Sequence, residues 1–164
     1  MQAPQPQWQL KIAPSVDAAL PTLWTIGYEK LLPPELVAEL EAAGVERVID
    51  VRFRPQSRRP GMSKTRLGQL LADHGIAYES RKELGTPADI RFLFHKGKIE
   101  EAAAAFRAHL AEHGTEALDE LDAELENGPR TALFCLEADP STCHRRVVTD
   151  ALQARRPDLR VVDL

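Results

Sequence analysis

The stretch that decides the fold lies near the C-terminus and reads TALFCLEADPSTCHRR, residues 131–146. Its first six residues form an apolar run of the kind found in buried β-strands. Asp139 is a favoured N-cap residue and Pro140 suits the first position of a helix, so we expect a helix to begin there. The stretch therefore predicts a buried strand, an acidic turn and a helix in immediate succession.

The start of this predicted helix carries reactive and basic side chains. Cys143, His144 and Arg145 should lie in or just after its first turn. The free amide groups and the positive dipole end of a helix favour thiolates and bound anions. We therefore take Cys143 and His144 as candidate catalytic residues. Arg145 and Glu137, which follows the strand, are candidates for binding a substrate or an anion.

Working outward from this unit, short β-type runs alternate with helical patterns from residue 23 onward. The β-type runs cover residues 23–27, 47–51, 76–78, 131–136 and 160–164, and the helical patterns cover residues 33–43, 63–74, 88–126 and 140–155. The alternation predicts an α/β fold, a three-layer helix-sheet-helix arrangement with a mainly parallel sheet of about five strands. We expect a single domain over residues 21–164, and an irregular N-terminal extension over residues 1–20, which are rich in Pro and Gln.

The composition is that of an ordinary globular protein, with 164 residues, of which 43% are hydrophobic and 28% charged. No apolar run has the length of a membrane span, and no signal-peptide pattern opens the chain. Its two cysteines are too few for a disulfide framework, so we expect reduced thiols and a cytoplasmic location. The sequence indicates no cofactor and no membrane partner, and it leaves the oligomeric state open.

Charge is distributed unevenly along the chain, although the net charge is only −4. Residues 51–72 hold six basic residues and no acidic one, whereas residues 98–126 hold nine acidic and two basic residues. The basic segment includes Arg52, Arg58 and Lys64, and guanidinium groups bind phosphate oxygens as a fork. We predict an anion site here, although no P-loop spacing is present. The alternative is a solvated loop in which Arg52 or Arg58 pairs with Asp50 or Glu137.

Two further candidates follow predicted strands, where ligands bind in open parallel sheets. Asp50 ends a strand beside Arg52, and it acts either as a structural partner of an arginine or as a base or metal ligand. Tyr28 follows Gly27, and its ring either stacks on a nucleotide base or covers the core. Both alternatives stay open for both residues.

The two cysteines have different expected roles. Cys143 at the helix start is the stronger candidate for a reactive thiol, with an inert structural role as the alternative. Cys135 lies within the predicted strand, where we expect it to pack as a small apolar residue. Cys135, Cys143 and His144 match none of the usual zinc spacings, so we predict no metal site. Adjacent helical positions point about 100° apart, so the order of Cys143 and His144 does not pair them.

Several short motifs occur together in one known family. They are Thr25-Ile26-Gly27-Tyr28, Asp50-Val51-Arg52 with Pro55, Ser57, Arg58, Pro60-Gly61 and Ser63-Lys64, Gly75-Ile76 with Tyr78, Leu84-Gly85, and the stretch from Cys135 to Arg145. In this order they give a chain that resembles the domain of unknown function 488 family over about residues 23–163. The resemblance implies a compact α/β domain without an established reaction. This chain has Met62 where the family commonly has an aromatic residue, and Asp163 where it commonly has a histidine.

Three functions remain in competition. The first is a phosphate-directed domain that binds or acts on nucleotides or nucleic acid through the basic loop and the Cys-His-Arg helix start. The second is a thiol-dependent enzyme that acts on a small anionic substrate, by sulfur transfer or a phosphatase-like step. The third is a non-catalytic domain that recognises a partner through the acidic segment 98–126 or the N-terminal extension.

Overall fold

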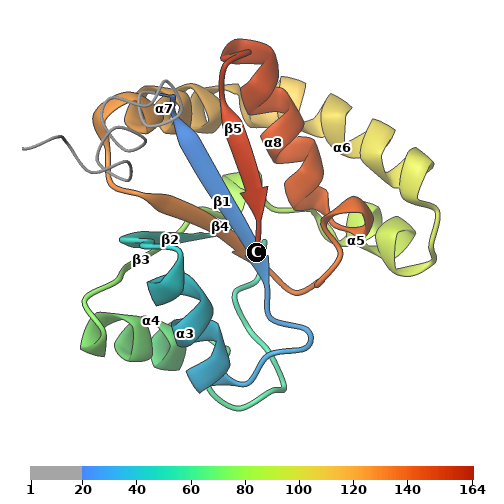
Figure 1. The fold of residues 1–164 in the computed structure, drawn as a ribbon. Helices are drawn as coiled ribbons and strands as arrows, with labels where there is room; N and C mark the ends of the chain where they lie inside the picture. Colours follow the sequence, from blue (N-terminus) through green and yellow to red (C-terminus); the bar gives the residue numbers. More distant parts are fainter. Residues whose placement is uncertain (1–19) are drawn as a thin grey trace, which may run out of the picture.

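Five parallel strands form the centre of the computed structural model, which describes residues 20–164 (Figure 1). The strands are β1 (Thr22–Gly27), β2 (Arg47–Asp50), β3 (Ala77–Ser80), β4 (Thr131–Cys135) and β5 (Arg160–Asp163). Their order across the sheet is β3-β2-β4-β1-β5, and every neighbouring pair is parallel. The predicted α/β class is confirmed. The predicted N-terminal extension falls almost entirely on residues 1–19, outside the described part of the chain.

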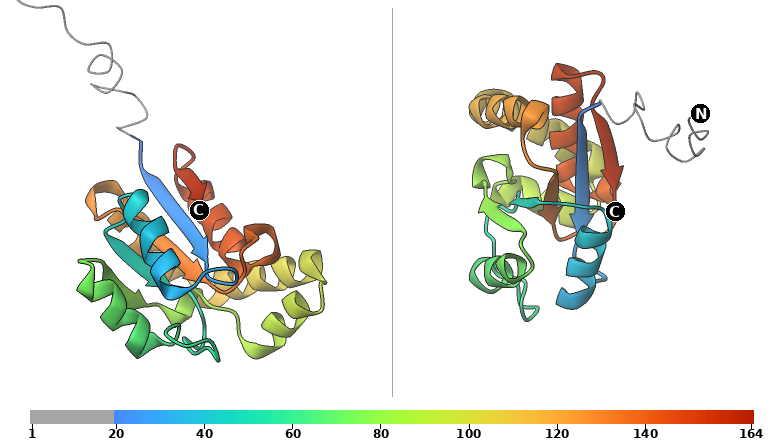
Figure 2. Two further views of the ribbon diagram at one scale, coloured as in Figure 1. Left: turned by 60° about the horizontal axis from the view of Figure 1, so that its bottom comes forward. Right: turned by 60° about the vertical axis from the view of Figure 1, so that its left-hand side comes forward.

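Within residues 20–164, six helices cover the two faces of the sheet. They are α3 (Pro33–Ala42), α4 (Lys64–Asp73), α5 (Ala88–His95), α6 (Ile99–His113), α7 (Thr115–Asn127) and α8 (His144–Arg155), with short 3-10 helices η1 (Lys82–Leu84) and η2 (Pro140–Thr142). Figure 1 shows α3 and α4 on one side of the sheet and α6 and α8 on the other. Both views in Figure 2 show β5, in red, beside β1, in blue. No helix among residues 20–164 is long and apolar enough to cross a membrane.

Alternating side chains of the central strands build two cores. On one face, Ile49 and Leu133 pack in a cluster with residues of α5, α6, α7 and α8. On the other face, Val48 and Phe134 pack with residues of α3 and α4. Every residue of β2 and β4 is buried, because helices exclude water from both faces, and this explains the apolar run of β4.

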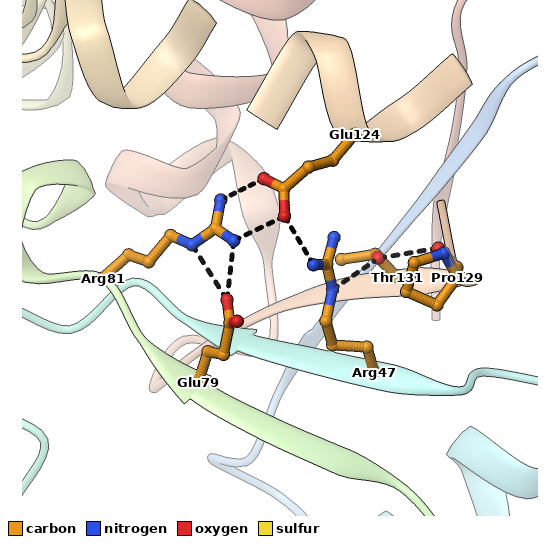
Figure 3. A network of polar contacts seen from close by, with 6 residues as sticks. All are labelled: Arg47, Glu79, Arg81, Glu124, Pro129 and Thr131. Carbon is orange, nitrogen blue, oxygen red and sulfur yellow. Dashed lines mark hydrogen bonds and ion pairs between the residues drawn. The ribbon is translucent and has the colours of Figure 1, made fainter. Parts of the chain in front are cut away.

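Tyr78 of the edge strand β3 packs against the core formed with α3 and α4, and charged side chains join this edge of the sheet to α7 on the other face. Glu124 of α7 lies between the guanidinium groups of Arg47 and Arg81 (Figure 3). Arg47 donates to it over 2.7 Å, and Arg81 donates over 2.7 and 2.8 Å. Hydrogen bonds from Arg81 and Arg47 lower the pKa of Glu124 to about 2, although partial burial opposes the shift.

The chain between β4 and α8 differs from the sequence prediction. One continuous helix from Pro140 was expected, but Asp139 caps the short helix η2, and Cys143 then takes an extended conformation with φ −126° and ψ 148°. Cys143 is thereby the N-cap of α8, and its sulfur accepts a hydrogen bond from the Arg145 amide over 3.5 Å. The break turns the thiol into the core, where only 2% of the residue is exposed.

The parallel arrangement brings one end of every strand to the same edge. Gly27 pairs with Cys135, and Asp50 pairs with Phe134, so β1, β2 and β4 end side by side. The chain leaves β1 and β2 toward α3 and α4, but it leaves β4 toward α8 on the opposite face. Such a switch opens a crevice at the carboxyl ends of the strands, where α/β proteins bind ligands.

Candidate functional site

A cavity of about 130 Å³ lies at this switch, beyond the carboxyl ends of β1, β2 and β4. Its polar and charged lining includes Tyr28, Arg52, Arg54, Arg91, His95, Cys135, Glu137 and His144. A larger cavity of about 650 Å³ lies at the opposite edge of the sheet, but none of the predicted site residues lines it. The small cavity is therefore the candidate site.

Arg52 is fixed in the wall of this cavity by Asp50. Its Nε donates to Asp50 Oδ1 over 2.9 Å, and its NH2 donates to Oδ2 over 2.7 Å. Burial lowers the pKa of Arg52, but the hydrogen bond and the charge of Asp50 outweigh it, so the pKa lies above its ordinary value. The fully buried Asp50 carboxylate also accepts the Tyr78 hydroxyl over 2.5 Å. The structure thus places Asp50 as the partner of an arginine, one of its two expected roles.

Tyr28 lies between the core and the cavity. Its ring stacks on Phe134 with centroids 5.1 Å apart, and the guanidinium of Arg52 lies 5.3 Å from the Tyr28 centroid. Its hydroxyl accepts a hydrogen bond from Arg52 NH1 over 3.4 Å, and only 3% of the residue is exposed. This placement corresponds to the expected cover over the core, with its ring already in contact with protein groups.

Of the three basic side chains expected to bind an anion in the loop after β2, only Arg52 lines the cavity. Arg58 and Lys64 are exposed and do not line the cavity. Arg59 donates to the carbonyl oxygens of Tyr28 and Glu29, each over 2.6 Å, and also to that of Leu31. Arg59 therefore attaches the basic loop to the loop after β1.

Two arginines that the sequence prediction omitted lie at the cavity, Arg54 from the basic loop and Arg91 from α5. Neither guanidinium has a hydrogen-bond or ion-pair partner among residues 20–164. Arg54 could have been found, because it stands two positions after Arg52 in the same loop. Arg91 could not, because only the packing of α5 brings it to the strand ends.

Arg145 does not reach the cavity. The residue is fully buried, and its NH1 donates to the sulfur of Cys135 over 2.9 Å and to the Glu137 carbonyl oxygen over 2.5 Å. Its NH2 donates to the carbonyl oxygen of Ala138 over 3.3 Å. Arg145 therefore holds the loop after β4 and faces one thiol, rather than presenting a fork to an external anion.

Both thiols are buried, and the one in the cavity lining is Cys135. Burial raises the pKa of Cys135 well above its ordinary value. Cys143 lies behind the lining, with its sulfur 3.6 Å from Nδ1 of His144. Nε2 of His144 lies 2.7 Å from the Val51 carbonyl oxygen, which only accepts hydrogen bonds. Nε2 therefore carries the proton, and the lone pair of Nδ1 is directed to Cys143.

The position of the family's terminal histidine lies outside the cavity lining. Asp163 accepts a hydrogen bond from Thr25 Oγ1 over 2.5 Å and pairs with Arg146 over 3.3 Å. Met62, the other departure, is fully buried in the core beneath α3 and α4. At both positions the residue of this chain thus contacts other parts of the protein and lies outside the cavity lining.

Comparison with known proteins agrees with the motifs. No curated protein and no solved structure matches the chain. A family model matches residues 33–152, which include the basic loop, β4 and the turn into α8. The resemblance inferred from the sequence is thereby confirmed, and the chain belongs to the family described as Domain of unknown function DUF488.

Proposed function

We propose that this protein is a phosphate-directed domain, which receives a phosphate group of a nucleotide or nucleic acid in the cavity beyond β1, β2 and β4. The observation that carries the proposal is the pair of cavity arginines, Arg54 and Arg91, whose guanidinium groups have no partner among the described residues. Guanidinium groups bind phosphate in a bidentate manner. The basic loop extends this positive charge beyond the cavity.

The size of the cavity limits what it holds. Its volume of about 130 Å³ is below the roughly 300–1,000 Å³ of pockets that enclose drug-sized ligands. One phosphate group therefore enters, while the rest of the ligand lies on the surface. The Glu137 carboxylate also lines the cavity and repels an anion, so Arg54 and Arg91 must supply the excess positive charge.

Calorimetric titration at low salt tests this function. We expect a nucleoside monophosphate and a 5′-phosphorylated oligonucleotide to bind, and their unphosphorylated counterparts to bind more weakly. Arg54→Ala and Arg91→Ala should each lower the affinity for the monophosphate about tenfold or more, because each removes a charge-assisted hydrogen bond. Arg58→Ala is the matched control, since Arg58 lies in the same loop outside the cavity lining. The proposal would be contradicted if Arg54→Ala and Arg91→Ala bound the monophosphate as tightly as Arg58→Ala and the unchanged protein do.

A second function, a thiol-dependent enzyme acting on a small anionic substrate, is favoured by one observation. The Cys135 sulfur lies on the cavity wall and accepts a hydrogen bond from Arg145 NH1, which favours the thiolate, although burial outweighs this contact and raises the pKa of Cys135. Alkylation with iodoacetamide, followed by peptide mass spectrometry, distinguishes the two functions. Rapid labelling of Cys135 that phosphate suppresses supports the enzyme, whereas slow labelling that phosphate leaves unchanged contradicts it.

A cytoplasmic location is part of the proposed function, and the two free thiols support it.

A further inference from the structure

We propose that Cys135, Cys143 and Glu137 bind a divalent metal ion of the zinc class at the inner wall of the cavity. Their two sulfur atoms and a carboxylate oxygen all lie within 4.8 Å of one another. The site goes beyond anion binding, because it needs neither Arg54 nor Arg91. The sequence prediction of no metal site rested on spacing alone, and η2 bends the chain between residues 137 and 143 so that an unusual spacing converges.

The separations suit a shared ion. The Cys135 sulfur lies 3.6 Å from Oε2 of Glu137. In a tetrahedral zinc site, bonds of about 2.3 Å to sulfur and about 2.1 Å to oxygen place two such ligand atoms roughly 3.6 Å apart. This pair therefore already has the spacing of two ligands of one ion.

The residues around these three groups match the surroundings of a metal site. His144 packs edge-on against Phe106 and donates its Nε2 proton to the Val51 carbonyl oxygen, so Nδ1 is an acceptor 3.6 Å from the Cys143 sulfur. In this position His144 orients Cys143. Such outer partners fix the geometry of metal ligands.

Charge balance also favours a cation. Two thiolates and a carboxylate carry three negative charges, and the buried Arg145, which donates to Cys135 over 2.9 Å, supplies one positive charge. A divalent cation supplies the other two, which makes the buried cluster neutral. Neutrality matters because uncompensated charge is costly away from water.

The donor set indicates the kind of metal. Thiolates select soft ions such as zinc, whereas magnesium and calcium require oxygen ligands. Three protein ligands leave the fourth position of a tetrahedral ion for water or for an anion. Cys135 and Glu137 line the cavity, so that position faces the proposed phosphate site.

Cobalt titration tests the site in the full-length chain, after reduction and removal of metals with a chelator. We expect one Co²⁺ per chain, a thiolate-to-cobalt charge-transfer band, visible bands of tetrahedral cobalt, and loss of all of them when Zn²⁺ is added. Proton release should accompany binding, because both thiols must ionise.

Variants identify the ligands. Cys135→Ser and Cys143→Ser should each lower cobalt affinity by more than about 100-fold and weaken the charge-transfer band. Glu137→Gln should lower the affinity while retaining the band. His144→Gln should cost about 10–100-fold, the range for outer partners. Glu83→Gln and His113→Gln are matched controls, since both side chains are exposed and lie away from the cavity lining.

Three results would overturn the proposal. They are absence of the charge-transfer band in the reduced protein, persistence of the full band in both serine variants, and unchanged affinity in Glu137→Gln with its fold intact by circular dichroism. Glu137 is partly exposed in a loop, so this variant remains informative if a buried serine prevents folding. Phosphate titration of the metal-free protein tests anion binding separately, so either proposal can fail alone.

Discussion

Gly27 allows the loop after β4 to close over the end of β1. A Cβ atom at this position would lie 1.7 Å from the Glu137 carbonyl oxygen and 2.9 Å from NH1 of Arg145. The backbone of the loop that carries Glu137 thus occupies the space that a side chain at position 27 would need. A glycine here is required by close approach rather than by an unusual backbone angle.

Gly27→Ala should therefore destabilise the protein. We expect the free energy of unfolding to fall by about 1–3 kcal/mol, the usual cost of an overpacked interior. Urea denaturation measures the change. The same variant should weaken cobalt binding, because Glu137 must move. A fully stable Gly27→Ala protein would show that the loop shifts without cost.

In helix α4, by contrast with Gly27, a glycine can be replaced by alanine with a gain in stability. Gly68 stands in its interior, where a Cβ atom would meet the Tyr78 ring at 3.4 Å, an ordinary contact. Gly68→Ala should raise the free energy of unfolding by about 0.5–1 kcal/mol, because glycine is a poor helix former. Urea denaturation beside Gly27→Ala checks this, and a loss of stability would mean that α4 and β3 are packed more tightly than the contact indicates.

The approach to α8 illustrates how short elements decide the position of a functional group. A continuous helix from Pro140 satisfies local preferences, yet the observed break at Cys143 buries the thiol beside Cys135 and gives α8 a sulfur cap. Tertiary burial here outweighs the local signal for a single helix. As a result, two thiols with different expected roles belong to one cluster.

Across the whole molecule, Glu124 joins three elements, since its carboxylate binds Arg47 of β2 and Arg81 after β3 from its place on α7. Glu124→Gln should lower the free energy of unfolding at neutral pH by about 1–2 kcal/mol. The estimate lies between exposed and buried ion pairs, because 32% of the Glu124 side chain is exposed and solvent screens part of the interaction.

The same network predicts a specific response to acid. Folding lowers the pKa of Glu124 from 4.5 to about 2, so its contribution is present above pH 4.5 and is lost as the pH falls toward 2. The stability difference between the wild type and Glu124→Gln should shrink over this window in urea denaturation. A difference that stays constant throughout the window would contradict the role of the ionised carboxylate.

Local patterns were sufficient to predict the five strands, the ends of α3 and α4, and the sheet edge beside the candidate site. Helices α3 and α4 end within one residue of the predicted ranges 33–43 and 63–74, and Gly44 and Gly75, with φ of 74° and 73°, follow their last residues. The apolar run of β4 indicated burial on both faces, because such a run needs cover from water on each side. These features depend on neighbours along the chain.

Which side chains line the candidate site depended on tertiary packing. The sequence prediction chose Arg58 and Arg145 for an anion and omitted Arg54 and Arg91. In the structure, Arg58 turns to solvent and Arg145 is enclosed by Cys135 and the loop carbonyls. A guanidinium is available to a ligand only where the fold leaves it near a cavity without a partner. Amino-acid order thus established the α/β elements and the edge where they end, and tertiary packing decided which charges and thiols meet there.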